Sequence, residues 1–175
     1  MKPGVFIILL ALLFAPSAGA KGGLKKYRSS KLGFSFSYPS RYKVAGCAGT
    51  HDPRPCVGLR AHPKEKDATV YISLLPMGLE PALEEEGRFE KVGGKWIAHG
   101  RGAVSPTVKL KGPGWRGLYA VTVCGISDES GFHGAGGECL TAMLNRGGRT
   151  FVVESDGTLP PSLLLNTIVK TFRMD

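Results

Sequence analysis

Apolar and polar residues alternate along several short stretches of this chain, which is the pattern of a β-strand with one buried face. Phe34, Phe36 and Tyr38 alternate with two serines. The segment 68–75 alternates in the same way, and its even-numbered apolar residues share one face. Glycines and prolines separate these stretches, as is typical of turns. The pattern predicts strands over residues 34–38, 42–45, 57–61, 68–75, 96–99, 107–110, 115–126, 139–145 and 150–155, the last two joined as a hairpin.

Two stretches have helical rather than strand periodicity. Residues 79–89 combine Pro81 in the expected first turn with three consecutive glutamates. Residues 163–173 carry apolar side chains on one helical face, with Ser162 as the expected N-cap. Strands interrupted by two helices predict an α+β fold, an antiparallel β-sheet of about seven or eight strands with packed helices. The residues expected to share its core are Phe34, Phe36, Val70, Ile72, Leu74, Val121, Val123, Phe151, Val153, Leu165, Ile168 and Phe172.

The N-terminus has the organisation of a secretory signal peptide. Lys2 precedes an apolar run over residues 5–15, and Ala18-Gly19-Ala20 forms a small-residue cleavage site. The run is too short for a bilayer, which takes roughly 20 apolar residues in a helix. We therefore predict a periplasmic or secreted protein without a transmembrane segment after cleavage. Its expected parts are a signal peptide over 1–20, a mobile segment over 21–31 and a single domain over 32–175.

Four cysteines follow the signal peptide, and an even number in an exported protein predicts two disulfides. Three pairings are possible, and pairing between sequence neighbours is favoured. A loop that contains glycine and proline separates Cys47 from Cys56. Cys124 and Cys139 lie at the ends of two predicted strands that flank a polar loop. If those strands pair antiparallel, the two cysteines face each other at a Cα separation within disulfide range.

The chain carries a formal net charge of +9, which favours an acidic partner. The candidates are an acidic protein and an anionic envelope polymer such as lipopolysaccharide, whereas we expect no nucleic acid partner. Only Lys25-Lys26-Tyr27-Arg28 approaches a cluster of basic residues. Solubility alone therefore also explains the charge.

Both ends of the predicted domain resemble PsbP-like domains. Residues 32–42, LGFSFSYPSRY, are similar to the opening of that family. Residues 163–173, LLLNTIVKTFR, are similar to its apolar C-terminal helix and Ser/Thr-Phe-Arg/Lys ending. The resemblance implies an α-β-α sandwich and a non-catalytic exported binding or assembly domain, since relatives serve as photosystem subunits, secretion-system adaptors and envelope proteins. The cysteine loops are not part of the general pattern, so the resemblance does not indicate the partner.

The first cysteine loop also contains residue types that bind metals, because His51 and Asp52 lie between Cys47 and Cys56. Structural zinc sites use four ligands, usually at tighter spacing. In an oxidising compartment, disulfide formation competes directly with thiolate ligation. We therefore expect a disulfide here, and we expect no metal or other cofactor.

Two further kinds of site have little support in the sequence. The Gly-rich segment 131–138 runs between two predicted strands, whereas a phosphate-binding loop opens a helix. A serine hydrolase needs an activated serine, and no Gly-x-Ser-x-Gly motif occurs. The side chains left for such chemistry are His51, His62, His99 and His133, with Asp52 and Asp128.

These observations favour a non-catalytic exported module that recognises a protein partner in the cell envelope. The alternatives are binding of an anionic envelope polymer through the basic surface and an unrecognised hydrolase activity. The residues expected to contact a partner lie on the two cysteine loops and are His51, Arg54, Phe132 and His133.

Overall fold

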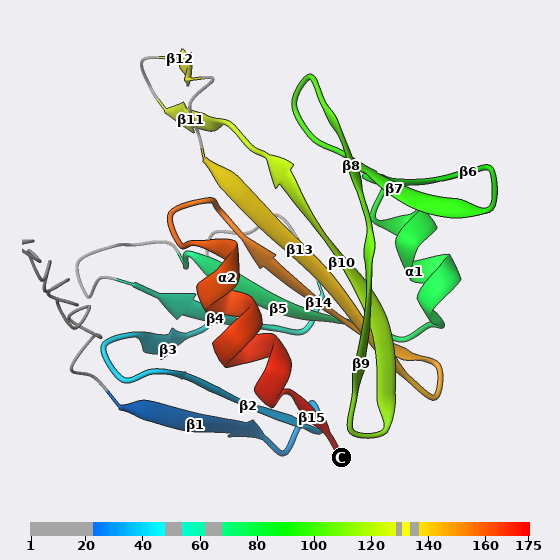
Figure 1. Ribbon diagram of the computed structural model, residues 1–175. Helices are drawn as coiled ribbons and strands as arrows, with labels where there is room; N and C mark the ends of the chain where they lie inside the picture. Colours follow the sequence, from blue (N-terminus) through cyan, green and yellow to red (C-terminus); the bar gives the residue numbers. More distant parts are fainter. Residues whose placement is uncertain (1–22, 48–53, 62–67, 129–130, 134–136) are drawn as a thin grey trace, which may run out of the picture.

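A seven-stranded sheet forms the centre of the computed structural model, which describes residues 23–47, 54–61, 68–128, 131–133 and 137–175. Its strand order is β3-β4-β5-β14-β13-β10-β9, and every neighbouring pair is antiparallel (Figure 1). We call it the large sheet. Its strands, in that order, are Lys43–Ala45, Cys56–Arg60, Val70–Leu75, Arg149–Ser155, Glu138–Arg146, Trp115–Val123 and Val108–Gly112.

One face of the large sheet packs against a small sheet and the C-terminal helical segment. In the small sheet, β2 (Phe34–Pro39) lies between β1 (Leu24–Ser29) and β15 (Arg173–Met174). Helix α2 (Pro161–Leu164), red-orange in Figure 1, continues as a π-helical turn (Leu165–Val169). These elements and the large sheet enclose the main core. At its centre lie four fully buried aromatic rings, those of Phe34, Phe36, Phe151 and Phe172.

The opposite face packs against helix α1 (Leu79–Glu85) and a three-stranded sheet. That sheet consists of β6 (Phe89–Val92), β7 (Lys95–His99) and β8 (Val104–Pro106). A second, smaller core lies there and is formed by Leu75, Ala82, Leu83, Phe89, Ala98, Leu118, Ala120, Met143 and Val152. Because successive side chains of a strand point to opposite faces, the large sheet contributes to a core on each side.

A short hairpin follows β10 along the chain and is formed by β11 (Ile126–Asp128) and β12 (Gly131–His133). Within the described residues, no helix has the length and apolar character needed to cross a membrane.

The antiparallel sheet and the strand faces agree with the sequence prediction, but the protein has less helix than expected. The fold is largely β, with two short helical segments, rather than the predicted α+β. Helix α1 ends at Glu85 instead of residue 89 because Gly87 adopts a φ of +63°, which a helix cannot continue. Helix α2 begins at Pro161, so Ser162 lies inside it and is not the N-cap.

The N-terminal segment predicted to be mobile contains a strand. Residues 24–29 pair with β2 along their whole length. The ring of Tyr27 lies 5.4 Å from that of Phe36 between centroids, while Lys25 and Lys26 are exposed. Because the exposed face of such an edge strand is charged, its sequence shows no clear apolar alternation. The predicted signal peptide, residues 1–20, lies outside the described residues and stays a prediction.

Most of the predicted core residues pack in the main core or against it. The prediction is wrong for Val123, whose side chain is 44% exposed. Val123 is the last residue of β10, where the ladder with β13 ends. Apolar and polar residues still alternate at the end of β10, but this end lies beyond the part of the strand that other elements cover. Val123 is therefore exposed.

Candidate functional site

Both predicted disulfides are present. Cys47–Cys56 joins the chain after β3 to the start of β4, with a Cα separation of 6.0 Å. Cys124–Cys139 joins the chain after β10 to β13, with a Cα separation of 5.7 Å. Because the thiols of Cys47 and Cys56 are joined to each other, they are not available as zinc ligands. Two disulfides are typical of a protein exported to an oxidising compartment.

The second disulfide is diagonal rather than facing. The register of β10 and β13 places Cys139 opposite Thr122, not opposite Cys124. The N–H of Cys124 donates to the carbonyl of Gly137 at 3.2 Å, one step past the ladder. The expected pairing is therefore right, and the expected register is wrong by two residues.

Arg54 is the one predicted contact residue whose side chain the structure describes. Its guanidinium forms an ion pair with Glu86, whose side chain is 5% exposed at the end of α1. The pair attaches the first cysteine loop to that helix. The backbone of Phe132 and His133 lies in β12, and His51 lies outside the described residues.

Among the described side chains, His99 is the candidate that bears on hydrolase chemistry. Its Nε2 lies 2.8 Å from Glu90 Oε2 across the β6–β7 hairpin, and both side chains are exposed. No serine hydroxyl within the described part of the chain contacts this pair. The arrangement therefore lacks the nucleophile of a serine hydrolase.

A group of cations lies on β9 and β10, at one edge of the large sheet. The hairpin register pairs Lys111 with Arg116 and Lys109 with Leu118. Directly paired residues of an antiparallel ladder project from the same face, and Leu118 belongs to the second core. Lys109, Lys111 and Arg116 therefore share that face, and we call these three residues the basic strip.

Within the described structure, the cations of the basic strip form no ion pair. Lys111 and Arg116 are exposed, and no described carboxylate lies within ion-pair distance of either. Like charges directly opposite each other in a ladder are destabilising. An anionic group bound beside this pair would relieve that repulsion.

Two hollows meet at Arg116. The end notch, about 420 Å³ in volume, lies between the β9–β10 and β13–β14 turns. The side groove, about 580 Å³ in volume, lies between the β9–β10 hairpin and α1 with β7. The notch is lined by Lys111, Gly112, Gly114, Trp115, Arg116, Asn145, Arg146 and Gly147. The groove is lined by Leu79, Glu80, Pro81, Trp96, Lys109, Leu110, Arg116, Gly117 and Leu118.

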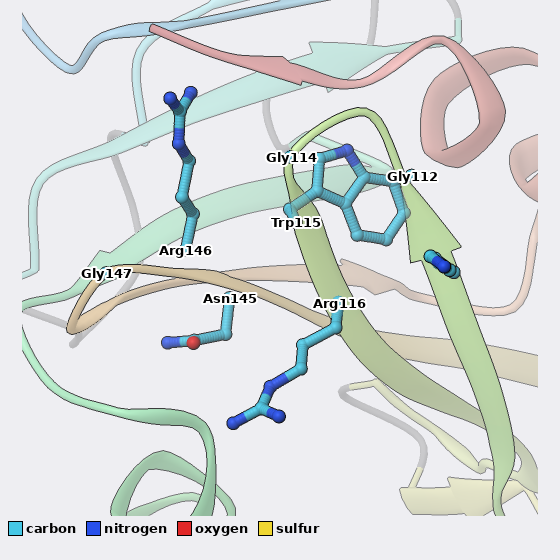
Figure 2. A pocket seen from close by; sticks show the side chains of 8 residues that line it. Gly112, Gly114, Trp115, Arg116, Asn145, Arg146 and Gly147 are labelled. Atoms are coloured by element: carbon cyan, nitrogen blue, oxygen red, sulfur yellow. The ribbon is translucent and has the colours of Figure 1, made fainter.

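The arginines of the end notch do not converge on one point. Figure 2 shows Arg146 directed to one side of the hairpin ends, whereas Arg116, next to Asn145, is directed to the other. Arg146 also donates a hydrogen bond to the carbonyl of Met174. One small anion cannot contact both guanidinium groups in this arrangement. The cations are instead spread along the edge of the sheet.

Trp115 fixes the end of the β9–β10 hairpin to the main core. Its Nε1–H donates to the carbonyl of Phe172 at 3.0 Å. The indole ring lies against Gly112, where an added Cβ would be 2.0 Å from a ring carbon. Glycine is therefore the residue that fits at position 112. The basic strip is consequently held on a hairpin that is anchored at its turn.

The basic strip does not stand out as a cluster in the sequence, because a turn separates Arg116 from Lys109 and Lys111. The signal that could have found it is Gly112-Pro113-Gly114 between two predicted strands. A hairpin across that turn places Lys111 opposite Arg116.

No family model matches the sequence, and no curated protein matches it. Among solved structures, a protein from Bacteroides thetaiotaomicron is similar, with a TM-score of 0.51 and 14% sequence identity over 86% of this chain. The match covers 48% of that protein, so this chain spans about half its length. The similarity concerns the fold alone.

The solution structure of cyanobacterial PsbP from Synechocystis also matches. Its TM-score is 0.46 at 11% identity, and the match covers 94% of this chain and 99% of that one. A PsbP structure is thus among the matches, as the resemblance at the two ends of the sequence predicted.

Proposed function

We propose that this protein is an exported, non-catalytic binding module that recognises an acidic protein partner through the basic strip and the side groove. The observation that carries the proposal is the exposed pair Lys111 and Arg116, two cations that lie opposite each other in the ladder and form no ion pair with a described carboxylate. The predicted signal peptide, the two disulfides and the PsbP-like resemblance support a periplasmic or secreted domain of this kind.

The chemistry of the side groove favours a protein over a uniformly charged polymer. One wall carries Lys109 and Arg116, and Glu80, which forms an ion pair with Lys91, also lines the groove. The rest of the lining is largely apolar, with Trp96, Leu79 and Leu118. Trp96 is half-buried, so part of its ring is available to a ligand. A protein segment supplies carboxylates and apolar side chains together, whereas a polyanion would leave the apolar wall uncovered.

The proposal is tested by affinity capture from envelope extract with matched variants. The test variant combines Lys111→Gln with Arg116→Gln. The control combines Lys25→Gln with Lys26→Gln. These two exposed lysines lie on β1, so the control also removes two positive charges but leaves the basic strip intact. We expect the wild-type protein and the control to retain an acidic protein at low salt, and the test variant to lose it. Retention should weaken as salt increases, because exposed charges are screened.

Two results would contradict the proposal. Equal capture by the test variant and the control would remove the basic strip from recognition. A captured material that resists protease and contains no protein would instead identify the partner as an anionic envelope polymer.

A further inference from the structure

Strand β9 forms an open edge of the large sheet. It pairs with β10 on one side, and no strand in the described ranges pairs with its other side. Alternate backbone N–H and C=O groups on that outer side therefore lack a partner strand. Such a row of groups is a template to which an extended segment can add.

The side chains of β9 separate by chemistry onto the two faces of the sheet. Val108 pairs with Tyr119, and Leu110 packs against the main core. Lys109 and Lys111 project from the opposite face as part of the basic strip. Val108 is 46% exposed, so the apolar side of this edge is only partly covered. A strand added here would meet apolar side chains on one face and cations on the other.

We infer that an extended segment of the partner, with alternating acidic and apolar residues, adds to β9 as a further strand. The inference rests on the proposed function and specifies how the acidic partner binds. Cross-strand neighbours in a sheet project from the same face. The acidic side chains would therefore lie beside Lys109 and Lys111, and the apolar ones beside Val108 and Leu110. A segment matched to Val108–Gly112 would satisfy the outer backbone groups of the whole strand.

A second copy of this chain does not fit the same edge. Two β9 strands paired about a two-fold axis would place Lys109 and Lys111 of one copy beside those of the other. Like charges in that position are destabilising. The positive charge of the edge therefore favours a different chain, one that carries negative charge.

The outer edge of the small sheet does not share this pattern. In β1, Lys25 and Lys26 are adjacent, so they project from opposite faces. An acidic–apolar segment added there would place apolar residues beside a lysine whichever way it faced. The β1 edge is therefore a suitable internal control.

Binding of synthetic peptides to the purified protein tests the inference. The probe is a fluorescent peptide of alternating valine and glutamate, matched in length to β9. Its control is the same peptide with every amide N-methylated, which keeps the charges but donates no backbone hydrogen bonds. We expect N-methylation to weaken binding by about tenfold or more, because at least two main-chain hydrogen bonds are lost.

Charge reversal supplies a second arm of the test. In a Lys109→Glu/Lys111→Glu variant, the valine–glutamate peptide should bind about tenfold more weakly. A valine–lysine peptide should bind that variant better than it binds the wild-type protein. In the wild-type protein, the valine–glutamate peptide should slow amide exchange in β9 by about tenfold and leave β1 unchanged.

The outcomes separate this inference from the proposed function. If both acidic peptides bind equally, strand addition is wrong while recognition of acidic groups stands. If neither binds, the inference is wrong, and the lysines of β9 only protect an edge strand from aggregation. The envelope capture with the Lys111→Gln/Arg116→Gln variant then decides the proposed function by itself.

Discussion

The aromatic centre of the main core and the β9–β10 edge are built from the same strand alternation, but they use it differently. Phe34 and Phe172 stack with centroids 5.3 Å apart and are fully buried. At the edge, Val108 is 46% exposed, and the cations of the opposite face form no ion pair with a described carboxylate. The first region has its partners within the chain. The second has, within the described structure, outer backbone groups without a partner strand, a half-exposed Val108 and cations without an ion pair.

Under the proposed function, stability and recognition belong to different regions of this fold. Rings buried from β2, β14 and the C-terminal segment contribute the hydrophobic stabilisation. The edge contributes little burial, so its residues can differ without loss of the fold. Substitutions in the aromatic centre should therefore lower the free energy of unfolding. Substitutions at the edge should weaken binding and leave that free energy nearly unchanged.

The largest effect on stability is expected from Phe172→Ala. Removing a ring that contacts Phe34 and Phe151 should lower the free energy of unfolding by about 3–5 kcal/mol, measured by denaturant titration. Val108→Ala at the edge should change it by no more than about 0.5 kcal/mol. A loss below about 1 kcal/mol for Phe172→Ala would mean that the C-terminal segment is peripheral to the core.

Replacing Cys124 and Cys139 with alanine should have the next largest effect. The bond closes a sequence separation of 15 residues, and the chain-entropy relation gives about 3 kcal/mol for such a loop. The comparison is between the oxidised wild-type protein and the double variant in the same denaturant series. An unchanged midpoint of denaturant unfolding would show that the bond does not stabilise the fold beyond the pairing of β10 with β13.

A smaller effect is expected from Trp115→Phe, at the junction of the two regions. The substitution removes the donor to the Phe172 carbonyl and keeps most of the ring. The free energy of unfolding should fall by about 1 kcal/mol, the net value of one buried hydrogen bond. Amide exchange at the β9–β10 turn should also become faster. Unaltered exchange there would mean that the turn does not depend on this anchor.

Two features could be predicted from the sequence because their strands each bury one full face. They are the alternation of Phe34, Phe36 and Tyr38 and the hairpin around residues 146–148. The cysteine pairs could be predicted because each flanks a loop between neighbouring strands. Strand β1 could not, because only Tyr27 and Ser29 of its residues are covered. The basic strip could not be recognised directly, because its members become neighbours only through the β9–β10 register.

The smallest effect on stability is expected from Lys111→Gln combined with Arg116→Gln. Relief of cross-strand repulsion should leave the free energy of unfolding unchanged or raise it by up to about 0.5 kcal/mol at low salt. The difference should disappear at high salt, where exposed charges are screened. A clear loss of stability would show that the pair is neutralised within the protein and is not available to a partner.

Photo-crosslinking in cells tests the central claim, that the β9 edge is the recognition surface, most directly. A photoreactive amino acid would replace exposed Val108 on β9 or, as the matched control, exposed Leu24 on β1. We predict that irradiation joins the position-108 protein to one distinct acidic protein and that the position-24 protein gives no such product. The same product from both positions, or a product from position 24 alone, would contradict the account.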